Sequence, residues 1–459
     1  MKKHLSFILL CAVMTVYCGK LSAQVAPAKT TTPEPATVAA PAPQPISLTW
    51  TGYVKTDFFI DSRQTAVLRE GSILFFPSAV DPDATGQDKN AVPTYNSLSV
   101  QSRIRLNAAG PEYFGFKANA AIEAEFFGNA EADENGLRLR HAFVQLTNSK
   151  VQLLFGQFWH PFYTPECAPS TLNFSTGAPF STFTRNPQFR ITTTGATKFF
   201  GALLTERDFT TPGPAAATAN IATPYVRNDL IPIVDFGFQS VQGNVTFGAT
   251  VDIKSIKPRT SVSFTNASKT VINTTTDTRM VGVSANAYFQ VKTKDVTFKA
   301  STIYSQNGSD MLLLGGYAES AIDSTTGKYS YTTMNAISAW VELSGKKNAF
   351  EWGVFAGYVA NLGLSDPLSS TVKGPGIYQF SLNTNVINAY RISPRVGWRS
   401  GKVLLGVELD VTTAQRSRAL LPGESTLTAL PAVTVANGSV VNVDQSTNAR
   451  LLFTAQYNF

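Results

Sequence analysis

Basic side chains at alternate positions are the most distinctive chemical feature of the sequence. Arginines stand at positions 103 and 105 and again at 138 and 140. Successive side chains of a β-strand point to opposite sides, so each pair predicts two guanidinium groups on one face of one strand. Rows of such groups attract anions and raise their local concentration. The residues predicted to line this charged surface are Arg103, Arg105, Lys117, Glu123, Arg138, Arg140, Arg185, Arg190, Arg391 and Arg395.

Catalytic and metal-binding chemistry finds little support in the sequence. His141 lies inside an alternating segment and His160 lies in the motif WHP. Neither has an evident nucleophile or acid beside it, and no group of histidines and cysteines has the spacing of a metal site. We therefore expect no enzyme, no bound metal and no cofactor. Lysines and arginines are scattered through the chain, so nucleic acid is not an expected partner.

The N-terminal residues predict export followed by a spacer. Residues 1–23 combine a basic start with a short apolar run and end in Ala23, the pattern of a secretory signal peptide and too short for a spanning helix. Residues 24–47 carry six prolines and predict a disordered linker. Removal of the signal peptide takes away three lysines and no acid, so the formal net charge falls from +7 to +4 and Cys167 remains as the only cysteine.

From residue 48 to residue 459 the sequence alternates between apolar and polar residues. The last ten residues, RLLFTAQYNF, place Leu451, Phe453, Ala455, Tyr457 and Phe459 in one row. Only 15% of all residues are charged, against about 25% in typical soluble domains, and no long helical pattern is present to cover an apolar face. Such a face suits lipid, with Tyr457 and Phe459 at the interface, provided that the sheet closes and leaves no backbone edge unpaired.

Seven short links alternate with eight longer ones between the predicted strands, and the first short link falls at 109–113. Short turns at one end, long loops at the other and an even strand number are typical of bacterial outer-membrane barrels. The predicted fold class is all-β, a transmembrane antiparallel β-barrel of 16 strands in the outer membrane, wide enough for an aqueous pore. Its strands are predicted at 48–60, 98–109, 114–127, 137–147, 151–157, 188–194, 197–206, 230–240, 244–254, 280–291, 295–305, 333–344, 348–361, 386–399, 402–413 and 446–459.

Two residues break the rule that polar side chains face the lumen. His141 and Gln145 share the predicted outward row of Leu137, Leu139 and Phe143. Either these two residues face a neighbouring subunit of a trimer, or the register changes locally at a bulge. The alternation alone leaves both explanations open.

The third long loop, residues 156–187, is too rich in aromatic residues and prolines for a loop exposed to solvent. We expect it to fold into the lumen and to narrow the pore; the alternative is that it packs over the outer mouth. Long loops of this composition need an apolar surface on which to pack. The predicted constriction residues in this loop are Trp159, His160, Phe162, Phe174, Phe180 and Phe183.

Acidic side chains on other strands leave the charge selectivity open. If they pair with the arginines across strands, the charges neutralise one another and set no selectivity. We favour a weak preference for anions, because the arginines flank the inward loop whereas several acids come from strands across the barrel. The acids are Asp57, Glu123, Glu125, Asp235, Asp252, Glu342, Glu351, Glu408 and Asp410.

Two motifs carry a family resemblance: GQFWHPF at 156–162 and FSTGAPFSTFTRNPQFR at 174–190. They resemble the bacterial outer-membrane porins of the DcaP-like trimeric type, particularly the versions found in Bacteroidota. The resemblance implies a 16-stranded homotrimeric porin that passes small hydrophilic, often anionic, solutes by diffusion. Some relatives carry a helical segment where this chain has its Pro-rich linker, which leaves a periplasmic assembly role open.

Two further expectations concern partners and the competing function. We expect the barrel assembly machinery to engage the C-terminal Phe459. A non-conducting structural or adhesive outer-membrane barrel remains the alternative function, because the strand pattern would be the same.

Overall fold

The computed structural model describes residues 46–214, 223–265, 268–369, 379–382, 386–417 and 443–459. Residues 44–459 form one structural unit. The predicted signal peptide, and the predicted linker up to residue 45, lie outside the described residues.

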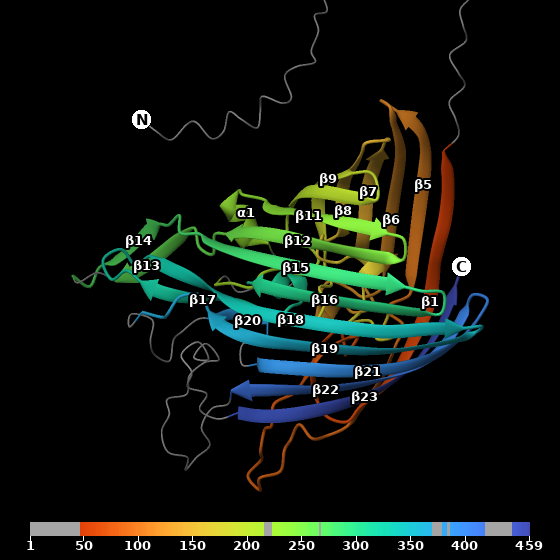
Figure 1. Cartoon of the computed structure of the whole chain (residues 1–459). Coiled ribbons are helices and arrows are strands. Elements are labelled where there is room, and N and C mark those ends of the chain that lie inside the picture. Colours follow the sequence, from red (N-terminus) through yellow and green to blue (C-terminus); the bar gives the residue numbers. More distant parts are fainter. Residues whose placement is uncertain (1–45, 215–222, 266–267, 370–378, 383–385, 418–442) are drawn as a thin grey trace, which may run out of the picture. The chain divides into compact units, whose positions relative to one another are not determined.

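Within the described residues, sixteen β-strands form the wall of the unit (Figure 1). They are β1 (Ser47–Asp61), β5 (Arg103–Tyr113), β6 (Phe116–Glu125), β7 (Arg138–Thr147), β8 (Val151–Trp159), β9 (Arg185–Thr193), β10 (Thr197–Leu204), β11 (Ile233–Gln242), β12 (Val245–Ile256), β15 (Met280–Lys292), β16 (Val296–Gln306), β18 (Tyr329–Lys347), β19 (Phe350–Leu364), β21 (Val386–Ser400), β22 (Val403–Ser417) and β23 (Val443–Asn458).

The first and last strands pair with each other and close the sheet. β1 runs antiparallel to β23 from the pair Tyr53 and Asn458 to the pair Asp61 and Arg450, and its other edge pairs with β5. Three short strands extend the wall at its loop end: β4 (Thr94–Leu98), β17 (Gly315–Ile322) and β20 (Gln379–Leu382). The prediction of a closed antiparallel barrel of 16 strands is confirmed.

The remaining described elements are short and lie in the loops. Among the described residues, no helix is long and apolar enough to cross a membrane. The hairpin of β13 and β14 extends beyond the wall at the loop end (Figure 1). The short elements in the loops are β2 (Thr65–Leu68), β3 (Ile73–Pro77), β13 (Ser261–Thr265), β14 (Val271–Thr275), α1 (Pro224–Asp229) and the 3₁₀ turns Glu131–Asp133, Pro165–Cys167 and Ser309–Met311.

Both chain ends of the barrel lie at the end with the short turns, as the alternation of short and long links requires. The first turn was predicted at 109–113 but lies at Phe114 and Gly115, because β5 continues through a bulge between Ala109 and Glu112. Phe114 and Gly115 have φ angles of 54° and 76°. Positive φ at both central residues is characteristic of the type I′ turn, whose twist matches that of the two strands.

Alternating exposure along the strands separates a lipid face from a lumen face. In β23, Leu451 and Phe453 are 52% and 40% exposed, whereas Arg450 and Thr454 are 1% and 0% exposed. The outward residues are apolar because hydrocarbon surrounds the wall, and the inward residues are polar because they meet the lumen. Tyr457 lies on the same outward row.

A bulge in β7 explains the two residues that broke this alternation. The pairing of β6 with β7 shifts between Glu123 and Ala124, so that Glu123 lies opposite His141 while Ala124 lies opposite Leu139. The extra residue, Arg140, changes the parity of the strand, because a bulge places two residues opposite one. His141 is therefore buried on the lumen side.

The rest of β7 follows the shifted parity. Gln145 pairs with the inward Asn119, and the guanidinium of Arg105 lies over the ring of Phe143, 5.7 Å from its centroid. The outward assignment of His141, Phe143 and Gln145 was wrong. These residues consequently give no support to a subunit interface.

The lipid face and the lumen face of a strand are expected to tolerate an introduced charge differently. Val341 points to lipid from the middle of β18, so Val341→Arg is expected to destabilise the barrel by about 2–4 kcal/mol. Ser344 of the same strand lines an internal cavity, so Ser344→Arg is expected to cost much less. Urea unfolding of both variants in lipid vesicles measures the difference. Equal losses would contradict the assignment of faces.

Candidate functional site

The loop between β8 and β9, residues 160–184, crosses the lumen and is called the constriction loop here. Its backbone amides bind carboxylates of the opposite wall: Ser170 donates to Glu342 at 2.7 Å, and Leu172 and Asn173 donate to Glu408 at 2.8 and 2.9 Å. Hydrogen bonds to charged groups contribute about 1.5–3 kcal/mol each. These contacts hold the loop against β18 and β22.

Basic side chains of the wall bind carbonyl groups of the same loop. Such contacts satisfy backbone acceptors that would otherwise be buried without a partner. The donors are Lys299 to Ala168 at 2.7 Å, Lys55 to Leu172 at 2.7 Å and Arg391 to Ala178 at 3.0 Å. The constriction loop is therefore fixed to strands on several sides of the barrel, and these wall charges are engaged with its backbone.

An apolar core lies inside the barrel between the constriction loop and the first long loop, which joins β1 to β5 and contains β3. Phe174, Phe180 and Phe183 of the constriction loop are buried in one cluster with Phe75 and Phe76 of β3. Arg391 joins the two loops, because its guanidinium also donates to the carbonyl groups of Leu74 and Phe75, at 2.9 Å each. The aromatic residues predicted to narrow the pore thus fill part of the lumen by packing on each other.

Five arginines and three acids form a buried ion-pair network on the wall beside the loop. Multiple guanidinium groups share each carboxylate, which compensates for the loss of water around the charges. Five positive and three negative charges leave an excess of two positive charges. The pairs are Arg103, Arg105 and Arg140 with Glu123, then Arg103, Arg138 and Arg140 with Glu125, then Arg138 and Arg185 with Asp208.

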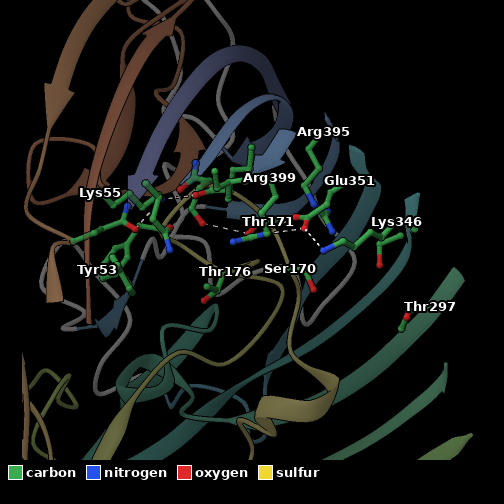
Figure 2. A pocket seen from close by; sticks show the side chains of 18 of the residues that line it. Tyr53, Lys55, Ser170, Thr171, Thr176, Thr297, Lys346, Glu351, Arg395 and Arg399 are labelled. Carbon is green, nitrogen blue, oxygen red and sulfur yellow. Dashed lines mark hydrogen bonds and ion pairs between the residues drawn. The ribbon is translucent and has the colours of Figure 1, made fainter. Parts of the chain in front are cut away.

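A cavity of about 620 Å³ lies below the constriction loop, toward the short turns. Figure 2 shows Tyr53 and Lys55 on one side of it and Lys346, Glu351 and Arg399 on the other. Among the described residues that line it, eight are basic and only two are acidic. The basic ones are Lys55, Arg103, Arg140, Lys292, Lys294, Lys346, Arg395 and Arg399, and the acidic ones are Asp295 and Glu351.

Some of the basic lining residues are partly neutralised by neighbouring acids. Arg399 and Lys346 both contact Glu351, at 2.7 and 3.2 Å, and Arg395 contacts Glu342 at 3.3 Å. Lys292 is the last residue of β15 and Lys294 lies in the turn that follows, and both line the cavity. Lys55 contacts Asp57 at 3.0 Å, and Arg103 and Arg140 contact Glu123 and Glu125, so the positive excess of the lining is smaller than the count of basic residues suggests.

The predicted site residues fall into two groups. Arg103, Arg140, Arg395, Trp159, Phe174 and Phe183 line the cavity. The others lie elsewhere in the barrel: Arg105, Lys117, Glu123, Arg138, Arg185, Arg190, Arg391, His160, Phe162 and Phe180. Arg190, for example, donates to the carbonyl of Trp159 at 2.7 Å. Several predicted arginines form ion pairs within the wall or donate to loop carbonyl groups, and they therefore do not line the cavity. These contacts depend on strand register and on the path of the loop.

Several lining residues were missed by the sequence reasoning. Tyr53, Lys55 and Gln101 line the cavity next to Arg103. Lys55 lies on the inward row of β1 with Tyr53 and Asp57, so the alternation of this strand could have predicted that Lys55 faces the lumen. Lys292 ends β15 and Lys294 lies in the following turn, where alternation gives no direction.

Comparison with known proteins shows the fold. No protein-family model matches this sequence, and no curated protein matches it. The outer membrane channel DcaP of Acinetobacter baumannii superposes with a TM-score of 0.60 at 16% identity, over 90% of this chain and 97% of that one. An anion-selective porin from Comamonas acidovorans superposes with a TM-score of 0.50 at 10% identity, over 90% and 100%. The chain therefore has the 16-stranded fold of outer-membrane porins.

The buried thiol of Cys167 tests the packing of the constriction loop. It donates to the carbonyl of Phe289 at 3.3 Å and is 2% exposed, and burial raises its pKa to about 11. In the chain from residue 24 onward, maleimide at pH 8 should modify folded Cys167 at least ~10-fold more slowly than a cysteine introduced at the cavity by Thr297→Cys in a Cys167→Ser background. Equal rates would show that the loop does not pack against β15.

Proposed function

We propose that the protein is a bacterial outer-membrane porin, a water-filled channel for passive diffusion of small hydrophilic solutes with a weak preference for anions. The observation that carries the preference is the lining of the internal cavity, with eight basic and two acidic side chains among the described residues. A concave surface lined by one sign of charge concentrates counter-ions. The porin fold supports the channel itself.

The hydrogen bonds that the acidic residues accept support the same proposal. Glu342 and Glu408 accept hydrogen bonds from amides of the constriction loop, and Asp410 accepts one from Asn173 at 2.8 Å. Carboxylates whose oxygens are held by loop amides are shielded from a passing ion. The acids of the far wall thus oppose the arginines less than their number in the sequence suggests.

We also propose the setting in which the channel works. Residues 1–23 direct export, residues 24–47 serve as a disordered linker and residues 48–459 span the outer membrane as one subunit of a homotrimer. The barrel assembly machinery would engage Phe459, whose amide donates to Gly52 at 3.0 Å beside the closing strand pair. The mass of the detergent-solubilised protein, measured by light scattering, tests the trimer, and a monomer would exclude it.

Planar-bilayer reversal potentials in a salt gradient test the anion preference. We expect anions to cross faster in the wild type, and the double variant Lys346→Ala/Arg399→Ala to lower the anion-to-cation permeability ratio by roughly twofold, because two cavity charges are lost. Lys89→Ala is the control, because Lys89 pairs with Asp81 in the first long loop. Cation selectivity in the wild type at neutral pH would overturn the preference.

The apolar core inside the lumen favours one competing function, a structural or adhesive barrel that does not conduct. Phe75, Phe76, Phe174, Phe180 and Phe183 occupy space that a wide pore would leave to water. Liposome swelling distinguishes the two functions, because only a porin admits small sugars and amino acids. Swelling at rates equal to protein-free liposomes would establish the non-conducting alternative.

A further inference from the structure

Three side chains that are far apart in the sequence meet where the constriction loop begins. His160 is the first residue of the loop, and Asp235 and Asp252 are directly paired residues of β11 and β12. Nδ1 of His160 lies 3.7 Å from Oδ2 of Asp235, and Nε2 lies 3.7 Å from Oδ2 of Asp252. All three side chains are buried, and one ligand atom from each lies within 4.8 Å of the others.

The carboxylate of Asp235 is unsatisfied. It is fully buried, and neither of its oxygens has a hydrogen-bond partner among the described residues. The pairing with Asp252 places a second buried carboxylate beside it. Two adjacent buried carboxylates repel each other and require a compensating positive charge or a shared proton.

The nearest cationic side chains are occupied elsewhere. Lys254, two residues beyond Asp252, binds Asp310 and donates to the carbonyl of Asn307 at 2.6 Å. Arg190 donates to Gln188 at 2.8 Å and to the carbonyl of Trp159. Neither makes an ion-pair contact with Asp235 or Asp252 within the described part of the chain. Among the described residues, the carboxylate pair therefore lacks a lysine or arginine partner, and the imidazole of His160 is the basic group that contacts it.

We propose that His160, Asp235 and Asp252 bind a divalent transition-metal ion of the Zn²⁺ type. One imidazole nitrogen and two carboxylates are a donor set that such ions accept, with solvent completing the shell. Metal–ligand distances of about 2.0–2.2 Å separate tetrahedral ligands by roughly 3.4 Å. The observed 3.7 Å between Nδ1 and Asp235 requires only a small contraction.

The hydrogen bonds around the imidazole define how it binds. Nδ1 accepts a hydrogen bond from the amide of Phe162 at 3.2 Å, so Nδ1 carries no proton and its lone pair is available to a metal ion. A metal ion on Nδ1 replaces this contact, and Nε2 then carries the proton and donates a hydrogen bond to Oδ2 of Asp252, which leaves the other oxygen of Asp252 as the ligand. Donation from the second ring nitrogen to a carboxylate is the usual support of a metal-bound histidine. The ion would fasten the start of the constriction loop to β11 and β12.

Metal titration of the full-length protein, purified in detergent without a histidine tag and stripped with chelator, tests the proposal. We expect one equivalent of Zn²⁺ to bind at pH 7.5 by calorimetry. Zinc-edge X-ray absorption should show one imidazole nitrogen and oxygen ligands. Absence of saturable binding of one equivalent, or a bound ion without an imidazole ligand, would overturn the site.

Single substitutions identify the ligands. His160→Gln, Asp235→Asn and Asp252→Asn should each weaken Zn²⁺ binding at least tenfold, while His141→Gln should leave it unchanged. His141 is the matched control, because it is also a buried lumen histidine near a carboxylate, 4.0 Å from Glu123. Unchanged affinity in Asp235→Asn would refute the site. Heat-modifiable gel mobility verifies folding, and if a variant fails to fold, the absorption spectrum of the wild type decides.

Discussion

Closure of the backbone hydrogen-bond ladder between β1 and β23 is the constraint on which the rest of the structure depends. Hydrocarbon offers no partner for an amide or carbonyl group, so an open edge would leave a full row of unsatisfied groups, each costing several kcal/mol. The pairing from Tyr53 with Asn458 to Asp61 with Arg450 removes both edges. Once the wall is closed, each strand must have one face toward lipid and one toward the lumen.

That constraint explains why most of the fold could be predicted from the sequence. A lipid-facing position excludes charge, so an apolar residue at every second position marks each strand. The prediction failed where parity changes within a strand. The bulge at Arg140 shows in the sequence only as two polar residues, His141 and Gln145, in an outward row, and a subunit interface would give the same pattern. The first turn was misplaced for the same reason, since the proline and glycine at 110–111 mark a bulge in β5 and not its end.

The charged side chains that line the cavity were harder to predict. Their availability depends on the hydrogen bonds and ion pairs that each side chain makes, and not only on the face of the strand from which it points. Strand parity correctly places Glu408 and Arg391 inside the barrel, yet both bind the constriction loop. Which inward charges remain available depends on the path of the loop, and that path is fixed by contacts between residues hundreds of positions apart. The cluster of His160, Asp235 and Asp252 was invisible for the same reason. It draws one residue from a loop and two from neighbouring strands.

The apolar core and the basic cavity are physically linked. Aromatic side chains inside the barrel escape water by packing on another loop or on apolar side chains of the wall, so Phe75 of the first loop and Phe180 of the third share one cluster with Phe355 of β19. A packed core has a low dielectric constant, and fields next to such a region are less screened than in water. Arg103 and Arg395, which border the loop at the cavity, therefore attract the acids that they contact, Glu123 and Glu125 for Arg103 and Glu342 for Arg395, more strongly than they would in an open pore. The same loop that narrows the lumen thus also strengthens the ion pairs of the wall beside it.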